Sequence, residues 1–201
     1  MISYKLLTMI VAGILLSGCT TTLPSVSEYR LSVKENKQLF SQTDCKVNSL
    51  KVGQAFSSSS LMTLNMNYGL GEHKQFAYTQ SQWAKTPNSA VSDALVHYIK
   101  ETELFKNVQI SKSRSNNSML LETNIEDFMQ YFSEDEKSSY SNVRISLTLI
   151  DTQTNRVVST QTFSSKVEVL SSDANGGVVA LNSALNNVLK EAVSWLGESC
   201  R

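Results

Sequence analysis

The sequence contains few of the residues and charge patterns from which metal and nucleic-acid sites are usually built. Its 201 residues include two histidines and three cysteines, and 18 basic residues balance 18 acidic ones. Nucleic-acid binding depends on clustered Lys and Arg, and no basic stripe is present. Two histidines and two cysteines that are expected to be bridged do not make a zinc site. We therefore expect neither a metal nor a nucleic-acid partner.

Near the N-terminus, a short apolar run stops at a cysteine. Residues 6–16 follow the cation Lys5 and are far fewer than the roughly 20 apolar residues that a spanning helix needs. A basic start, a short apolar run and small residues at a cut site are typical of a secretory signal. The stretch Leu16-Ser17-Gly18-Cys19 resembles a bacterial lipobox, in which a diacylglycerol joins the cysteine thiol and the chain is cut before it. We therefore predict a signal peptide at 1–18 and an N-acyl diacylglyceryl lipid on Cys19, with no other cofactor; the alternative is an ordinary signal with an incidental cysteine.

The predicted export signal indicates the compartment in which the mature protein works. The mature protein works in an oxidising compartment, and its acyl chains hold it at a membrane. Thr20 stands where an aspartate usually means inner-membrane retention in enterobacterial lipoproteins, so we expect the outer membrane. Cys45 and Cys200 are left as an even pair near the two ends of the folded region. We predict a disulfide between them, with two free thiols as the alternative.

The mature chain divides into a tether at 19–43 and one domain at 44–201. The tether shows little periodicity apart from 28–33, which is a candidate strand. The middle of the tether could therefore dock on the domain. Hairpin-length links and alternating faces favour an α+β fold, in which a mostly antiparallel sheet has both helices packed on one face and a polar second face. Alternation predicts strands within 45–56, 61–68, 73–80, 107–111, 119–132, 142–152 and 157–169, and a period near 3.6 predicts helices from Pro87 and over 178–196.

No catalytic set is convincing. Asp93 and His97 lie four residues apart near two serines, but all share one short helix without the strained turn that exposes a nucleophile. The acidic residues Glu126, Asp127 and 134–136 are weak candidates for a cation site, because neighbouring strand residues point to opposite faces. We therefore predict a protein that is not an enzyme, and we interpret 133–139 as a charged hairpin tip.

Four aromatic residues are candidates for contact with a partner. Phe128 and Phe132 fall on the even positions of 119–132, which are otherwise polar, and an exposed apolar patch marks a contact surface. Tyr78 and Trp83 form a second candidate patch just before the first helix. The alternative is an ordinary core with a few exposed aromatic rings.

Together these features are similar to one known family. The lipobox is followed by Tyr29-Arg30-Leu31, by Tyr78 and Trp83-Ala84 before the first helix, by a turn at 151–158, and by a final amphipathic helix ending "AVSWL". In this pattern the chain resembles the ABC-type transport auxiliary lipoproteins, which include the lipoprotein partners of mammalian-cell-entry (MCE) transport systems and of Pqi-type operons. The family commonly has Gly in the turn, where this chain has Asn155.

The resemblance implies a non-catalytic protein at the outer membrane that accompanies a periplasmic MCE assembly and an inner-membrane ABC permease and ATPase. Such systems are thought to move phospholipid or other hydrophobic molecules between the two membranes. Ring-forming partners are compatible with a homo-oligomer. Two other classes stay open: an assembly lipoprotein of another outer-membrane or secretion complex, and an anchored hydrolase, against which the missing oriented nucleophile argues.

Overall fold

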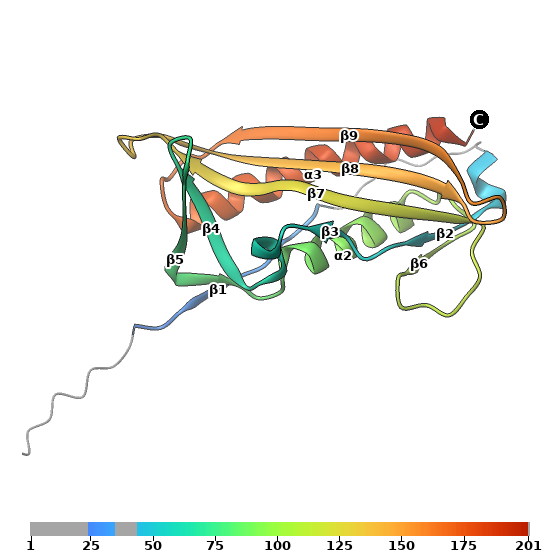
Figure 1. The fold of residues 1–201 in the computed structure, drawn as a ribbon, viewed down its shortest axis with the longest axis horizontal. Coiled ribbons are helices and arrows are strands. Elements are labelled where there is room, and N and C mark those ends of the chain that lie inside the picture. The colour runs from blue at the N-terminus through green and yellow to red at the C-terminus, as the bar shows by residue number, and fades with distance from the viewer. Residues whose placement is uncertain (1–23, 35–43, 201) are drawn as a thin grey trace, which may run out of the picture.

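The computed structural model describes residues 24–34 and 44–200, so the signal peptide, Cys19 and parts of the predicted tether lie outside the described residues. In the described chain nine strands form one sheet, and two α-helices lie on one of its faces (Figure 1). The elements in chain order are β1 (Ser27–Tyr29), the 3-10 turn η1 (Asp44–Val47), β2 (Ser49–Val52), β3 (Phe56–Ser57), the 3-10 turn η2 (Ser59–Met62), β4 (Asn65–Leu70), β5 (Lys74–Trp83), α2 (Pro87–Glu101), β6 (Asn107–Ile110), β7 (Met119–Phe132), β8 (Ser139–Asp151), β9 (Arg156–Glu168) and α3 (Ala174–Ser199).

The long strand β7 is the centre of the sheet. On one side it pairs along its whole length with β8, which in turn pairs with β9, and both ladders are antiparallel. On its other side β2, β3 and β4 pair with successive parts of β7, and all three run parallel to it. The α+β class is therefore confirmed. The longest ladders are antiparallel, as predicted, but the sheet is mixed because its short strands pair in parallel. Parallel partners need a long crossover connection, and here the chain between β4 and β7 includes α2.

A β-bulge in β7 changes which of its residues face the helices. The pairing with β8 shifts register between Ile125 and Asp127. Before the bulge Leu121 and Ile125 are buried, whereas after it Phe128 and Gln130 are buried. An inserted residue moves every later side chain to the other face of the sheet. The predicted buried face, which ran along odd positions to the end of the strand, is therefore wrong beyond the bulge.

The start of each helix is specified by a residue that deals with the unpaired backbone N–H groups of the first turn. Pro87 lies in the first turn of α2, where its missing N–H would have had no helical partner. Asp173 caps α3, because its side chain accepts a hydrogen bond of 2.7 Å from the N–H of Gly176. Both helices pack on the sheet through aliphatic side chains. The largest fully buried ones include Leu95, Ile99, Leu121, Ile145, Leu147, Leu149, Leu185, Leu189 and Leu196.

The middle of the predicted tether is packed on the domain. β1 extends the sheet by pairing in parallel with the end of β5. Beyond β1, the backbone N–H groups of Ser32 and Lys34 donate to the side-chain oxygens of Asn182 and Asn186 on α3, at 2.7 and 2.9 Å. Packed chain therefore already occurs within 19–43, well before the predicted boundary at residue 44.

Cys45 and Cys200 form a disulfide, as the sequence predicts. The bridge joins η1 to the residue that follows α3, and the two Cα atoms lie 5.2 Å apart. Cys45 is fully buried. The cross-link therefore ties the start of the domain to its last helix.

Candidate functional site

Two of the four predicted contact residues lie in the core. Trp83 and Phe128 are 4% and 3% exposed, and their ring centroids are 5.9 Å apart. Phe128 is buried because the bulge in β7 turns its side chain toward the helices. The prediction that these two residues contact a partner is therefore wrong for the folded chain.

The other two predicted contact residues belong to one aromatic cluster, which we define as Tyr68, Phe76, Tyr78 and Phe132. The ring of Tyr68 is central, with centroid distances of 4.7 Å to Tyr78, 5.4 Å to Phe132 and 5.7 Å to Phe76. Three of the rings come from β4 and β5, which form the hairpin at the left end of Figure 1. Phe76 is 46% exposed. Because tilted and edge-to-face rings stabilise one another, this is an ordered surface with one projecting ring.

A buried amide holds the aromatic cluster from below. The hydroxyl of Tyr78 donates to Oε1 of Gln130 at 3.0 Å, and Nε2 of Gln130 donates to the hydroxyl of Ser139 at 3.0 Å. Gln130 is 2% exposed, so both of its polar ends are satisfied inside the protein. Burial is the main cause that raises the pKa of Tyr78 above its usual range. The cluster is therefore fixed by both ring contacts and hydrogen bonds.

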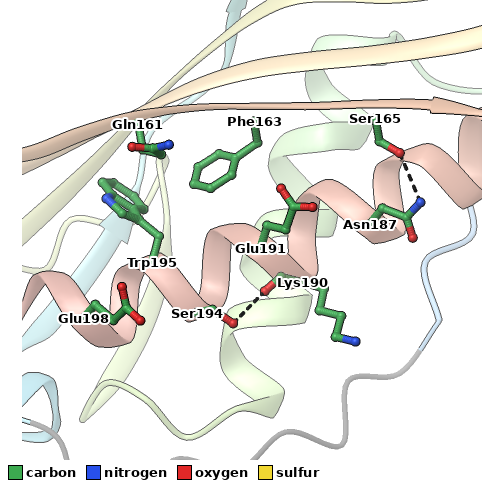
Figure 2. Close-up of a pocket in the computed structure, with 9 residues that line it drawn as sticks. All are labelled: Gln161, Phe163, Ser165, Asn187, Lys190, Glu191, Ser194, Trp195 and Glu198. Carbon is green, nitrogen blue, oxygen red and sulfur yellow. Dashed lines mark hydrogen bonds between the residues drawn. The ribbon is translucent and has the colours of Figure 1, made fainter.

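A second candidate surface is the groove between β9 and α3 (Figure 2). Within the described residues β9 pairs only with β8. The other edge of β9 therefore has no strand beside it, and another strand could pair there. Trp195 is fixed in the groove, since Nε1 donates to Ser159 at 3.1 Å and the ring packs edge-on against Phe163 at 5.8 Å. The groove has a volume of about 630 Å³ and is lined by Gln161, Phe163, Ser165, Asn187, Lys190, Glu191, Ser194, Trp195 and Glu198.

Sequence reasoning missed this groove and also missed Tyr68 and Phe76. The edge position of β9 depends on the order of strands in the sheet, which the local pattern does not encode. Phe76 lies within the strand that the sequence predicts over 73–80, and the signal that could identify it is the spacing of two residues between the rings of Phe76 and Tyr78.

The sheet face opposite the helices is polar and carries one half-buried carboxylate. Asp127 accepts hydrogen bonds from the hydroxyl of Tyr131 at 2.8 Å and from Nδ2 of Asn142 at 2.7 Å. Loss of solvent raises the pKa of Asp127 more than these hydrogen bonds lower it. The ring of Tyr131 stacks on Tyr140 at 5.3 Å, and the ammonium of Lys166 lies 3.6 Å from the Tyr140 centroid.

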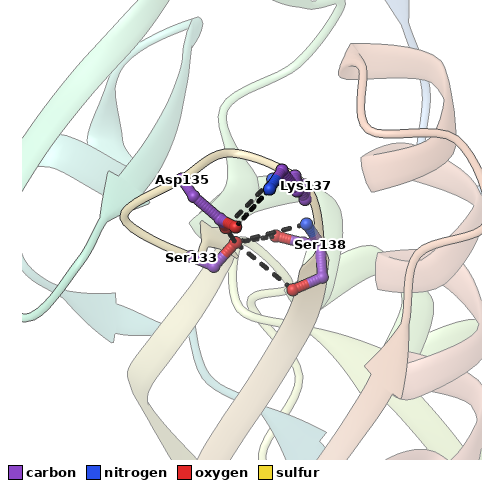
Figure 3. Close-up of polar contacts among 4 residues, drawn as sticks. All are labelled: Ser133, Asp135, Lys137 and Ser138. Atoms are coloured by element: carbon purple, nitrogen blue, oxygen red, sulfur yellow. Dashed lines mark hydrogen bonds and ion pairs between the residues drawn. The ribbon is translucent and has the colours of Figure 1, made fainter.

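The β7–β8 hairpin ends in a charged tip, as predicted, and Figure 3 shows how that tip is held. The hydroxyl of Ser133 donates to Oδ1 of Asp135 at 2.7 Å, and the backbone N–H of Lys137 donates to the same oxygen at 3.3 Å. The hydrogen bond from Ser133 is the largest cause that lowers the pKa of Asp135. Across 24–34 and 44–200, no three His, Cys, Asp or Glu side chains gather as a metal site.

The candidate catalytic residues of α2 have other partners. The carboxylate of Asp93 is paired with Lys85, and Nε2 of His97 lies 3.2 Å from Oε1 of Glu101. The hydroxyl of Ser92 is buried and donates to a helix carbonyl one turn earlier at 2.8 Å. On this helix the geometry does not join a serine to an oriented base.

Comparison with known proteins decides the family. Residues 29–193 match the family described as the ABC-type transport auxiliary lipoprotein component. The chain belongs to this family. The resemblance drawn from the sequence is confirmed, and the match covers most of the packed part of this auxiliary lipoprotein, from β1 into α3. Neither described helix of the auxiliary lipoprotein combines the length and the apolar character needed to cross a membrane.

Solved structures resemble the auxiliary lipoprotein in fold. Protein XCC0632 from Xanthomonas campestris, of the family DUF330, has a TM-score of 0.76 and 16% identity, covering 86% of this chain and 96% of that one. An uncharacterized protein has a TM-score of 0.66 and 13% identity, covering 86% and 99%. The hypothetical protein CT253 from Chlamydia trachomatis has a TM-score of 0.51 and 8% identity, covering 77% and 98%. No curated protein matches the sequence.

Replacing Asp127 with Asn in the auxiliary lipoprotein is expected to remove a pH dependence of its stability. A carboxyl whose pKa is raised by folding binds more protons in the native state than in the unfolded state between the two pKa values. The unfolding free energy of the wild type therefore falls as the pH rises from about 3.9 through the raised native pKa. The difference in unfolding free energy between Asp127→Asn and the wild type should therefore rise with pH over that interval. Urea unfolding at several pH values measures it.

The control for this prediction is Asp135→Asn, because the pKa of Asp135 is shifted in the opposite direction. The wild type gains stability from Asp135 as the pH rises toward about 3.9, so this variant should lose relative stability over that lower interval. A relative stability of Asp127→Asn that does not change with pH would contradict the prediction.

Proposed function

We propose that this auxiliary lipoprotein is a non-catalytic docking subunit of an MCE-type ABC transport system, anchored at the outer membrane through the acylated Cys19. The system would move lipids or other hydrophobic molecules between the inner and outer membranes. The observation that carries the proposal is the family match over 29–193, which includes nearly all of the folded unit. The placement of Asp93, His97 and Ser92 with separate partners supports a role that needs a surface and no catalytic centre.

The aromatic cluster is the surface that we assign to docking. Binding energy at interfaces is concentrated in a few large side chains, and aromatic residues are prominent among them. Ordering such side chains costs conformational entropy unless they are already fixed before binding. Tyr78 is already fixed by Gln130, and Tyr68 by its three ring neighbours, while Phe76 projects into solvent. A partner would therefore bind side chains that are already ordered, at a lower cost in conformational entropy.

Photocrosslinking from the exposed ring tests the proposal. A photoreactive amino acid replaces Phe76 in the acylated protein in cells, and captured proteins are identified by mass spectrometry. We expect an MCE-domain protein to be captured from this position. Val47 is the matched control, because it is 79% exposed and lies on η1, at the end of the sheet far from the β4–β5 hairpin (Figure 1).

The other outcome would support a different function. Capture of only outer-membrane assembly or secretion proteins from Phe76 would contradict the MCE proposal and favour an accessory lipoprotein of such a complex. If the MCE protein is captured, Phe76→Ser should weaken its binding about tenfold, since truncation of a contributing interface residue typically costs more than 1 kcal/mol.

A further inference from the structure

The packing of β1 limits how far the domain can stand from its anchor. Only residues 20–23 separate Cys19 from Pro24, the first described residue. An extended chain spans at most about 3.6 Å per residue, so Pro24 lies within about 18 Å of Cys19. A tether reaching to residue 43 would span several times this distance, but its middle is held on β5 and α3. The β1 end of the domain must therefore stay close to the bilayer that holds the anchor.

Three exposed apolar residues lie on the segments next to the strand by which the chain enters the domain. Val26 is 48% exposed, Met62 48% and Leu64 41%, and we define these three residues as the entry patch. Tyr29 pairs with Trp83, whose N–H donates to the carbonyl of Leu64 at 2.7 Å. Strands lie about 4.8 Å apart and rise about 3.3 Å per residue, so Leu64 and Val26 are each about 10 Å from Tyr29. In Figure 1 β1, the end of β5 and the start of β4 meet at one corner of the domain.

We propose that the entry patch lies against the phospholipid bilayer, with its three apolar side chains at the level of the lipid headgroups. The proposal rests on the acylation of Cys19 in the proposed function. The short chain between Cys19 and β1 argues that this patch contacts lipid. Residues 20–26 bring the start of β1 no farther than about 29 Å from the anchored cysteine. This distance leaves little room for a folded partner between the patch and the bilayer. Apolar residues next to an acyl anchor add a second, weaker attachment to the same surface.

This orientation leaves the docking surface accessible. Tyr68 follows Leu64 by four residues along β4, which is about 13 Å of strand. The β4–β5 hairpin leads away from the corner where the chain enters, as Figure 1 shows. A partner can therefore reach the aromatic cluster while the entry patch lies on the membrane.

Lipid-phase quenching of a fluorescent label tests the entry patch. Leu64→Cys is made in the acylated protein, where the lipid on Cys19 and the Cys45–Cys200 disulfide leave the new thiol as the site of labelling. The labelled protein is placed in vesicles of phosphatidylethanolamine and phosphatidylglycerol that contain spin-labelled phospholipid. We expect the label at Leu64 to be quenched severalfold more than a label at Val158. Val158 is the matched control, because it is 42% exposed and lies near the start of β9, at the opposite end of the sheet from β1 (Figure 1).

Each outcome decides the proposal. Equal quenching at Leu64 and Val158 in a protein whose acylation is verified by mass spectrometry would overturn the entry patch and leave the anchored docking function standing. A mature protein without the acyl mass on Cys19 would overturn both. A label at Leu64 that is shielded only after a partner protein is added would assign the patch to protein contact. Val26→Cys repeats the measurement at a second position of the patch, in case Leu64→Cys fails to fold.

Discussion

Removal of the Cys45–Cys200 disulfide is expected to lower the free energy of unfolding by about 5 kcal/mol, because the bridge closes a loop with a sequence separation of 155 residues. In the chain-entropy model, a cross-link stabilises mainly by restricting the unfolded chain, and the restriction grows slowly with loop length. For a chain of this size such a loss corresponds to a fall in Tm of about 10 °C. The double variant Cys45→Ala/Cys200→Ala and thermal unfolding followed by circular dichroism measure it.

Reductant provides the control for the disulfide prediction. Reduction should lower the Tm of the wild type by a similar amount and leave the Tm of the double variant unchanged. The bridge joins the turn before β2 to the end of α3, so the reduced protein is expected to loosen first where these two segments meet. An unchanged wild-type Tm, with both thiols found free by alkylation before reduction, would show that the bridge is absent in the protein.

Gly176→Ala is expected to destabilise the domain by about 3 kcal/mol, although alanine normally stabilises a helix by about 1 kcal/mol relative to glycine. A Cβ at this position would overlap the backbone carbonyl oxygen of Ser171 and lie 2.9 Å from Cγ1 of Val169. The helix cannot shift freely to relieve the overlap, because the N–H of Gly176 is held by the Asp173 cap at 2.7 Å. Urea unfolding at neutral pH measures the change.

Asn175→Ala is the matched control, since Asn175 is the exposed neighbour of Gly176 in the same turn of α3. This substitution should change the unfolding free energy by less than about 0.5 kcal/mol. If Gly176→Ala is as stable as the wild type, the close approach of α3 to the preceding loop is wrong. The result also bears on the aromatic cluster, because the adjacent Gly177 leaves the space that Gln130 occupies beneath Tyr78.

Several elements could be predicted because short-range chemistry specifies them. Pro87 begins α2, as a proline in the first helical turn predicts, and α3 contains the whole apolar stripe expected over 178–196. Asn155 has a φ of 54°, the left-handed conformation that asparagine tolerates and that the turn after β8 requires. The two long hairpins of β7, β8 and β9 follow from alternation that continues across turn residues.

The candidate site shows where this reasoning fails. Phe132 and Tyr78 were found in the sequence and do belong to the aromatic cluster, but Phe128 and Trp83 lie in the core. Alternation assigns Phe128 to the polar face because nothing in the local pattern indicates the bulge at Glu126, two residues earlier. Once one residue is inserted in the ladder, the alternation continues, but even-numbered residues now face the helices and odd-numbered residues face away from them.

The sequence by itself determined the predicted export signal with Cys19, the positions of the helices and long strands, the pairing of Cys45 with Cys200, and the resemblance to the family. These depend on side chains that are close in the chain or on residue types that are few. Only the tertiary structure decided that β2, β3 and β4 line up in parallel on one edge of β7, that residues 27–34 pack on the domain, and that β9 is left at the edge. Strand pairing is a competition among segments far apart in sequence, so its outcome depends on the summed burial and register of the whole sheet and not on any one stretch of residues.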